Sequence, residues 1–451
     1  MSGPTSELLL GIDVGTTWCK AAVVAPDGSE LEHHRVPVPW RAVPTGAEIE
    51  PERLPELALA AARGALDRAT PGRVVGVGVT SMAETGALID EHDEPVAPAI
   101  AWHDRRGSEE AAAVGREIGE ERFSATTGLP ASPLCTLAKY RWLRGHHPPS
   151  TRGARWLNVA EWVVHQLGGE VVTELSLASR TGMLDLDRRA QWDEALAWAS
   201  APRGLLPEPV PAGTMAGRLG RGLEQARGAA LCVAGHDHHC AAVGAGAVND
   251  HDVFDSCGTA EAFVRTVRPP LSRELRLRAV ASGVTVGWHV IPARQAMLGA
   301  FESGLALQRL GRLLRMEDET SRRALDAAAL SARASGDGAA LLDGDSDGIP
   351  EGAEPAELWR AALETLAARG AAMLDTLEGL AGAAERLVVT GGGVRSEAAR
   401  VTRRAAVGAF EHPPVEEAAA RGAALLAGCA AGLFGGIDEL PPPAATGTDA
   451  L

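Results

Sequence analysis

Three short glycine-containing turns follow apolar runs at widely separated places in this sequence. They occupy residues 13–17 (Asp-Val-Gly-Thr-Thr), 255–259 (Asp-Ser-Cys-Gly-Thr) and 390–393 (Thr-Gly-Gly-Gly). Glycine lets backbone N–H groups approach phosphate oxygens, Thr hydroxyls add donors, and Asp offers a hard oxygen for Mg²⁺. One such turn predicts little, because glycine-rich turns also close hairpins. Their recurrence favours a site for phosphate groups.

A second chemical segment is Gly-His-Asp-His-His-Cys at residues 235–240. Asp237 follows an apolar run and precedes small residues, so we expect its carboxylate at the end of a strand, where it could act as a general base. The alternative is a helix N-cap. His236, His238, His239 and Cys240 are zinc ligands by type, but they are too close in sequence for one tetrahedral ion. We therefore expect a structural or solvent-facing role for His238 and His239.

A third motif lies at residues 343–354, which fit the calcium-loop pattern Asp-x-Asp-x-Asp-Gly-x5-Glu. Pro350 stands where paired calcium loops place a residue that donates its backbone N–H. Residues 336–342 read as a strand, whereas a calcium loop follows a helix. An acidic surface loop is the favoured interpretation, and calcium binding is the alternative.

The elements that must position these residues alternate between strands and helices, which predicts an α/β fold. Residues 8–15 and 19–25 predict a β-hairpin, residues 51–69 a helix, and residues 74–80 a buried strand. The pattern of a strand, a glycine turn and a second strand starts again near residue 253, so we expect the second half to repeat the arrangement of the first. Other predicted helices are 108–120, 137–144, 159–167, 306–314, 321–331, 356–377 and a buried one within 422–437, and other predicted strands are 230–234, 253–254, 260–267, 279–284, 287–291 and 387–390. We expect domains at 1–246 and 247–436 and a tail at 437–451.

Length and composition restrict the class of protein. The 451 residues carry 43 basic and 59 acidic side chains, a net charge of −16, which disfavours nucleic acid as a partner. Six scattered cysteines and no basic leader indicate a reducing, cytoplasmic setting, and the longest near-apolar stretch is too short to span a membrane. Only Lys20 and Lys139 are lysines, which we attribute to codon bias.

Neither a Walker P-loop nor a dinucleotide-binding glycine fingerprint is present, so another phosphate-binding fold must explain the turns. The sequence resembles the FGGY family of carbohydrate kinases, within the actin-like, ribonuclease-H-like ATPases. The resemblance covers about residues 8–433 and rests on the three turns and on segments in the family's order. These segments are 78–86, 98–106 (with Trp-x-Asp-x-Arg), 157–160, 173–180, 235–238 and 416–423.

The resemblance implies two ribonuclease-H-like domains, with ATP and Mg²⁺ in a cleft between them and a small sugar or polyol held mainly by the first. It implies Asp237 as the general base and Asp13 as the Mg²⁺ residue. The implied nucleotide-binding residues are Asp13, Gly15, Thr16, Thr17, Lys20, Gly258, Thr259, Gly391, Gly392 and Gly393. The implied substrate-binding residues are Met82, Glu84, Trp102, Asp104, His236 and Asp237.

Several alternatives stay open at this point. Trp102 could serve core packing, Asp104 a local ion pair with Arg105, and Lys20 the surface. The substrate could be a ketopentose, a polyol or a sugar acid, and a homodimer is neither indicated nor excluded. An actin-like nucleotide switch or a degenerate kinase acting as a sugar sensor would share the glycine turns, although the switch would have no use for Glu84 or Trp102.

Overall fold

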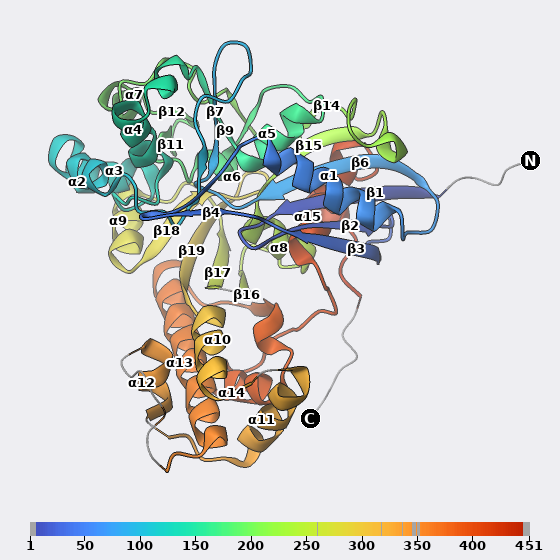
Figure 1. Cartoon of the computed structure of the whole chain (residues 1–451), viewed down its shortest axis with the longest axis vertical. Helices are drawn as coiled ribbons and strands as arrows, with labels where there is room; N and C mark the ends of the chain where they lie inside the picture. The colour runs from blue at the N-terminus through green and yellow to red at the C-terminus, as the bar shows by residue number, and fades with distance from the viewer. Residues whose placement is uncertain are drawn as a thin grey trace, which may run out of the picture. The chain divides into compact units, whose positions relative to one another are not determined.

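The computed structural model describes residues 6–444 except 259, 317, 336, 345–348 and 350–351. These residues form two compact units (Figure 1). Unit 1 contains the chain up to Val248, Thr266–Ala296 and Val415–Ala444. Unit 2 contains Asn249–Arg265 and Met297–Pro414.

A six-stranded sheet forms the centre of unit 1. Its order is β14 (Met215–Arg218), β15 (Ala230–His236), β6 (Arg73–Ser81), β1 (Glu7–Val14), β2 (Trp18–Val24) and β3 (Glu30–Pro37). β1 pairs antiparallel with β2 and parallel with β6, and β15 continues the parallel part. β1 is buried almost throughout, as a continuous apolar run predicts, whereas β3 alternates between half-buried and exposed residues, as an edge strand does. The antiparallel pairing of β1 with β2 confirms the hairpin predicted at residues 8–15 and 19–25.

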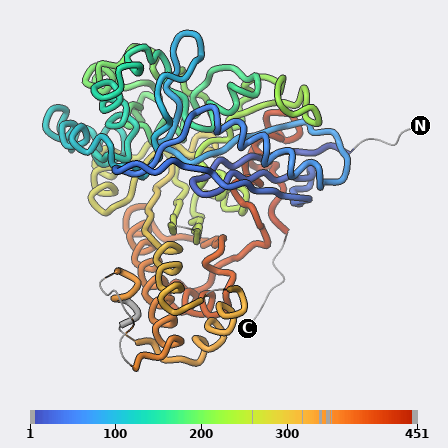
Figure 2. Tube along the Cα trace, in the orientation of Figure 1, coloured from blue at the N-terminus to red at the C-terminus, as the bar shows by residue number. Residues whose placement is uncertain are grey.

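The helix α15 (Ala418–Ala430) returns from the C-terminal part of the chain to pack on β1 and β6, as the colours of Figure 2 show. Glycines on the strands permit this approach. A Cβ at Gly11 would lie 1.7 Å from the carbonyl oxygen of Ala420, and one at Gly78 would lie 2.1 Å from that of Ala423. The helix begins earlier than predicted, at Ala418. It also ends earlier, because Gly432 turns the chain in the left-handed region.

Some of the other elements of unit 1 pack on this sheet, and others enclose a second apolar core. The helices are α1 (Arg53–Leu66), α2 (Ser108–Val114), α3 (Glu120–Thr127), α4 (Thr136–His146), α5 (Val159–Gln166), α6 (Leu175–Ala178), α7 (Asp193–Trp198), α8 (Asp237–Gly244) and α9 (Arg273–Ala281). The elements around the second core include α3, α4 and α7. The short strands are β4 (Arg41–Val43), β5 (Gly46–Ile49), β7 (Gly86–Ile89), β8 (Ala99–Ile100), β9 (Arg155–Asn158), β10 (Thr173–Glu174), β11 (Leu184–Asp185), β12 (Ala190–Gln191) and β13 (Pro209–Val210).

The second sheet repeats the start of the first. Its order is β18 (Val284–Trp288), β19 (Gln295–Glu302), β17 (Ala260–Val267), β16 (Asp252–Cys257) and β20 (Arg386–Thr390). β16 pairs antiparallel with β17 and parallel with β20, as β1 does with β2 and β6. The predicted strand at 279–284 is wrong for residues up to Ala281, which belong to α9. Ser272 caps that helix by accepting a hydrogen bond from the N–H of Leu275.

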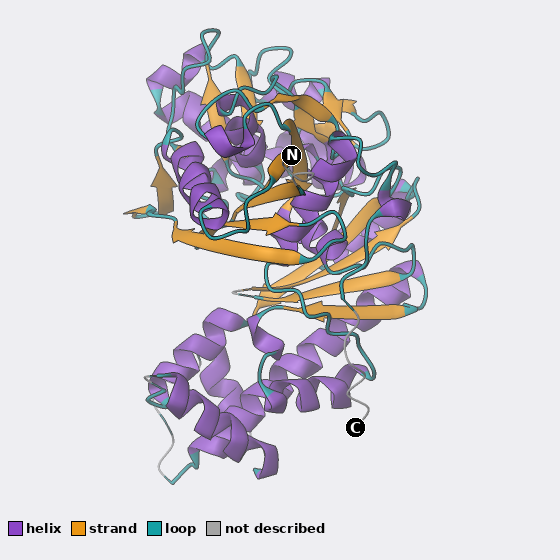
Figure 3. Ribbon diagram, turned by 90° about the vertical axis from the view of Figure 1, so that its right-hand side faces the viewer, coloured by secondary structure: helices purple, strands orange, loops and turns teal. Residues whose placement is uncertain are grey.

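Helices make up most of the rest of unit 2 (Figure 3). They are α10 (Gly304–Leu313), α11 (Glu319–Ser331), α12 (Asp337–Asp343), α13 (Pro355–Ala381) and α14 (Glu397–Val407). The strand predicted at 336–342 is wrong, because residues 337–343 form α12, whose Leu341 and Leu342 pack into an apolar core with α13. Short apolar runs do not distinguish a strand from a buried helix.

The six cysteines are all reduced, and all but the half-buried Cys429 are buried. Burial raises the pKa of every one of these thiols, that of Cys135 to about 11 and that of Cys232 to about 12. Within the described part of the chain, no helix has the length and apolar character that crossing a bilayer would require.

Candidate active site

The first glycine turn places Asp13 at the end of β1, opposite Lys20 on β2. Asp13 is buried, and its Oδ1 atom has no hydrogen-bond partner among the described residues. Burial raises the pKa of Asp13 to about 7, and the nearby Asp237 and Glu417 add to the rise while Lys20 opposes it. A buried carboxylate oxygen without a partner fits a cation or its bound water, so the residues present are compatible with Mg²⁺.

Lys20 is not a free surface group. Its Nζ atom lies 2.8 Å from Oε2 of Glu417, and its side chain is 30% exposed. The other turn residues differ in exposure: Gly15 donates its N–H to the carbonyl oxygen of Trp18 at 3.1 Å, and Thr17 is exposed. The turn therefore presents Thr17 to solvent, next to the buried Asp13 and the half-buried Lys20.

Asp237 is the first residue of α8, directly after β15. Its Oδ1 accepts the N–H of His238 at 2.7 Å, and Nε2 of His236 lies 3.3 Å away. Burial raises the pKa of Asp237 to about 7, with Glu84 contributing, while the His238 hydrogen bond, Lys20 and Arg180 lower it. A carboxylate with a pKa near neutrality has the proton affinity that a general base needs.

Glu84 lies close enough to Asp237 to raise its pKa, and Arg180 holds it in place. Nε and Nη2 of Arg180 both lie 2.7 Å from Oε1 of Glu84, and Nη1 donates to the hydroxyl of Thr285 at 2.7 Å. Glu84 adopts a φ of 59°, a left-handed conformation that is uncommon for a residue with a side chain. Strain of this kind gathers at functional sites.

Trp102 and Met82 meet the first turn at Thr16. The indole Nε1 of Trp102 donates to the hydroxyl of Thr16 at 2.8 Å, and that hydroxyl lies 3.9 Å from the sulfur of Met82. The half-buried indole is therefore held by a polar contact as well as by packing. The structure thus joins three residues that the sequence placed in one site.

Lys139 contacts the segments that carry Glu84 and Trp102, and the sequence did not point to this role. It is fully buried on α4, and its ammonium donates to the carbonyl oxygens of Trp102 at 2.8 Å, Glu84 at 3.2 Å and Leu134 at 3.2 Å. All three N–H donors of the group are thereby used. Burial lowers the pKa of Lys139 to about 8. The rarity of lysine in the chain could have drawn attention to it, because Arg replaces Lys nearly everywhere else.

Lys139→Met should separate this role from general stability. Methionine keeps the length of the side chain but donates no hydrogen bond, so the segments of Glu84 and Trp102 lose their common anchor. We expect the KM for the molecule that accepts the phosphoryl group to rise about tenfold or more, since hydrogen bonds from charged groups contribute roughly 1.5–3 kcal/mol each. The KM for ATP should change little. Steady-state kinetics would contradict this role if both KM values rose equally.

Two of the predicted substrate residues, Asp104 and His236, are buried. Asp104 is completely buried, and its oxygens accept hydrogen bonds from the N–H groups of Ala47 and Arg106 and from the Arg106 guanidinium, at 2.8–3.1 Å. Arg106 also pairs with Glu48. Asp104 therefore fixes the local backbone, and its ion partner is Arg106, not Arg105. His236 is also buried, so its ring can reach Asp237 but not solvent.

The histidines around Asp237 form a cluster of rings that meet both face to face and edge to face. His239 is buried and stacks on His289 with ring centroids 4.6 Å apart, and the centroids of His236 and His239 are 4.9 Å apart. Burial lowers the pKa of each of these rings, that of His289 to about 3 and that of His238 to about 4. His239 is thus structural. In the described part of the chain these rings do not form a group of three closely spaced ligand atoms.

Unit 2 brings the second and third glycine turns together. Gly391 has a φ of 101°, and a Cβ there would lie 2.5 Å from the carbonyl oxygen of Cys257. A Cβ at Gly393 would lie 2.8 Å from Cβ of Cys257, whereas one at Gly392 would meet nothing. Only glycine permits this close approach. Gly258 is exposed next to it, and Thr259 lies outside the described residues.

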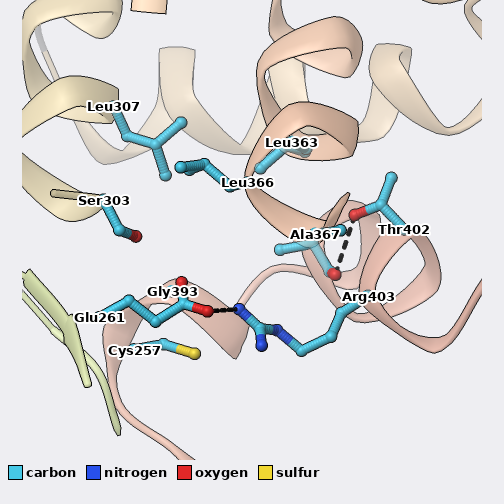
Figure 4. Close-up of a pocket in the computed structure, with 11 residues that line it drawn as sticks. Cys257, Glu261, Ser303, Leu307, Leu363, Leu366, Ala367, Gly393, Thr402 and Arg403 are labelled. Carbon is cyan, nitrogen blue, oxygen red and sulfur yellow. Dashed lines mark hydrogen bonds and ion pairs between the residues drawn. The ribbon is translucent and has the colours of Figure 1, made fainter. Parts of the chain in front are cut away.

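A buried ionic cluster lies beneath these turns. Arg403 of α14 pairs with Asp255 of β16 and with Glu261 of β17, and Figure 4 shows the Arg403–Glu261 pair beside Cys257 and Gly393. The three residues line or adjoin a cavity of about 20 Å³, the size of one water molecule. Burial raises the pKa of Asp255 well above its usual range. Because Arg403 contacts Oδ2 of Asp255 and the thiol of Cys257 contacts Oδ1, Asp255 offers no free oxygen comparable to that of Asp13.

The calcium-loop motif lies largely outside the described residues, since 345–348 and 350–351 are not described. Its first residue, Asp343, ends α12 and pairs with Arg369.

Comparison with known proteins agrees with this geometry. Residues 8–244 match the FGGY family of carbohydrate kinases, N-terminal domain, and residues 278–431 match its C-terminal domain. Glycerol kinase of Aromatoleum aromaticum is 30% identical over 473 residues, which cover 96% of this chain and 92% of that protein. L-Fuculokinase of Escherichia coli K12 is 31% identical over 192 residues, and that match spans 42% of this chain and 41% of the relative.

Solved structures show the same fold. Xylulose kinase from Rhodospirillum rubrum superposes with a TM-score of 0.81 at 24% identity, covering 96% of this chain and 92% of that one. Plasmodium falciparum glycerol kinase with ADP gives a TM-score of 0.81 at 16% identity, covering 99% and 94%. The class is thus the ribonuclease-H-like, actin-like fold. Within it, the chain belongs to the FGGY family of carbohydrate kinases.

Proposed function

We propose that the protein transfers the γ-phosphoryl group of ATP to a hydroxyl of a small, neutral sugar or polyol. One observation carries the proposal: in unit 1 the carboxyl group of Asp237 raises the pKa of Asp13, that of Glu84 raises the pKa of Asp237, and each of the three has a different set of partners. Asp13 has an oxygen without a partner, Glu84 is held by Arg180, and Asp237 starts a helix. These different surroundings suit three different roles: cation binding by Asp13, acceptor binding by Glu84 and proton transfer by Asp237.

Asp13 would bind Mg²⁺, directly or through water, at its unpartnered Oδ1. Mg²⁺ supplies positive charge that offsets the charge on the β- and γ-phosphoryl oxygens. In unit 1, Gly15, Thr16, Thr17 and Lys20 would hold the terminal phosphates. In unit 2, Gly258 and Thr259 would hold phosphate oxygens, and Gly391–Gly393 would seat the adenosine.

Asp237 would act as the general base. The acceptor hydroxyl oxygen forms a bond to the γ-phosphorus as the bond to the β–γ bridging oxygen breaks, and the hydroxyl proton passes to the Asp237 carboxylate. ADP carries away the electron pair of the broken bond. With a pKa of about 7, Asp237 is substantially ionised at neutral pH, and proton transfer to it is still favourable.

Glu84 and Trp102 would hold the acceptor, with Met82 against the same turn and Lys139 anchoring their segments. Oε1 of Glu84 is occupied by Arg180, so Oε2 would accept from an acceptor hydroxyl. A carboxylate on the substrate would meet Glu84 and Asp237 at close range, and like charges in a buried site repel. We therefore favour a neutral sugar or polyol over a sugar acid, and we assign no substrate contact to Asp104.

A panel of acceptors tests this function. ADP release in the presence of Mg²⁺ and ATP should be accelerated by at least one neutral polyol or ketose, and sugar acids should be poorer acceptors. If a sugar acid accelerated ADP release more than every neutral compound, the preference for a neutral acceptor would be wrong, but the proposed kinase function would stand. No acceleration by any compound would favour the rival function, an actin-like nucleotide switch or a sugar sensor without phosphoryl transfer.

A further inference from the structure

We propose that Ser176 is a positioning residue for Asp237, acting through a hydrogen bond to the backbone of the turn that precedes it. The inference rests on the proposed role of Asp237 as general base. Ser176 lies on α6, sixty residues away from His236 in sequence, and its hydroxyl oxygen accepts the N–H of His236 at 2.9 Å. His236 is the residue directly before Asp237.

The turn needs such support because β15 departs from regular pairing there. The pairing of β15 with β6 shifts register between Val233 and Gly235, and Gly235 has a φ of 106°. Side-chain hydroxyls supplement the irregular ladder at this point: Thr80 donates to the carbonyl oxygen of Gly235 at 2.6 Å, and Ser176 accepts from His236. The hydroxyl groups of Thr80 and Ser176 thus fix the backbone of Gly235 and His236, which sets the direction of α8 and the position of Asp237.

Ser176 is itself held in one orientation. Its hydroxyl donates to Oε2 of Glu174, which also accepts the backbone N–H groups of Ser176 and Leu177. Because a hydroxyl has a single hydrogen, donating it to Glu174 leaves the oxygen lone pairs for His236. The backbone N–H of Glu174 is bonded in turn to Glu161 at 2.8 Å. All of these side chains are buried.

The contact leaves little room for movement. A Cβ at Gly235 would lie 2.6 Å from the Ser176 hydroxyl oxygen and 2.8 Å from Oε2 of Glu174. Removing the hydroxyl would leave the buried His236 N–H without its partner and open a small void against the turn. The start of α8 could then shift, and Asp237 would shift with it.

The test compares Ser176→Ala with Ser179→Ala. Ser179 is equally buried one turn further along, but its hydroxyl bonds to the carbonyl of Leu175 and the N–H of Trp288 instead. We expect Ser176→Ala to lower kcat roughly ten- to a hundredfold, with KM values for ATP and acceptor within about threefold of wild type, because small displacements of a reacting group are costly. Ser179→Ala should keep kcat within about twofold.

Hydrogen exchange supplies a readout independent of activity. A peptide covering residues 233–238 should lose amide protection in Ser176→Ala and not in Ser179→Ala, at matched thermal stability. Equal protection in the two variants, or lost protection with unchanged kcat, would overturn the proposal. If Ser176→Ala does not fold, Ser176→Cys, with a similar size and a weaker acceptor, should show the same pattern to a smaller degree. Failure of the proposed function is seen separately, as wild-type protein that no acceptor stimulates, and the exchange comparison would still decide whether Ser176 holds the turn.

Discussion

Asp237→Asn is expected to abolish most acceptor-dependent ADP release while leaving ATP binding nearly unchanged. Asparagine has the same shape and still accepts the N–H of His238, but it cannot take the hydroxyl proton. General-base catalysis contributes about 10²- to 10⁴-fold, so kcat should fall by that factor. Steady-state assays and nucleotide titration measure the two effects. Turnover within a few-fold of wild type would remove Asp237 from the base role.

The same variant should be more stable than the wild type, and more so at high pH. The folded-state pKa of Asp237 is raised from 3.8 to about 7, so the folded protein holds this proton more tightly than the unfolded chain does. Any stability from the protonated group is complete below pH 3.8 and is lost as the pH rises toward 7. Asn never ionises, so the gain in Tm should be larger at pH 8 than at pH 5.

Asp27→Asn is the matched control for this pH dependence. Asp27 is exposed, and the N–H of Ser29 bonds to its carboxylate at 3.0 Å, which lowers its pKa. Its contribution has the opposite sign: it is present above pH 3.8 and is lost as the pH falls below that. Asp27→Asn should therefore give no gain in Tm at pH 8, and kcat should stay at the wild-type level. Equal thermal shifts in the two variants would contradict the burial argument.

Gly422→Ala should reduce both stability and turnover. Gly422 of α15 lies against α8, and a Cβ there would be 1.9 Å from the carbonyl oxygen of Cys240 and 3.0 Å from the N–H of Gly244. Backbone atoms cannot move aside as a flexible side chain can, so the helices must separate. Overpacking of this kind costs about 3 kcal/mol. Because α8 begins with Asp237, we also expect kcat to fall.

Gly379→Ala controls for the intrinsic preference of alanine for helices. Gly379 lies within α13, and a Cβ there would meet no atom within 4 Å. This substitution should raise the free energy of unfolding by roughly 0.5–1 kcal/mol. Thermal or denaturant unfolding of both variants checks the pair. If Gly422→Ala were stabilised to the same extent as Gly379→Ala, the close packing of α8 on α15 would not matter to the fold.

The elements that the sequence predicts well are those set by local pattern. The hairpin of β1 and β2 and the strand before Asp237 follow from apolar runs that end at turn residues, and the structure confirms them. The residues before β18 could not be assigned in this way, because the short apolar segment at 279–281 suits a helix as well as a strand. The outcome depends on the cap that Ser272 provides.

The residues of the candidate site also fall into those that a local pattern reveals and those that depend on tertiary contacts. Asp13, Asp237 and Glu84 are visible as residues beside turns, whereas Lys139, Arg180 and Ser176 act through partners 37 to 96 residues away. No spacing rule links Ser176 to His236, since the contact exists only once α6 packs beside β15. Asp104 shows the converse: its motif suggested a substrate contact, but tertiary partners occupy its oxygens.

The buried thiols make this chain convenient for spectroscopic labelling. All six cysteines have a raised pKa, and five of them are enclosed in the core, so the native protein should react slowly with maleimides. A cysteine introduced at an exposed position, such as His103 next to Trp102, would then be the preferred target for a fluorophore. Nucleotide and acceptor could be titrated against its emission after replacement of a single native thiol, the half-buried Cys429, with serine.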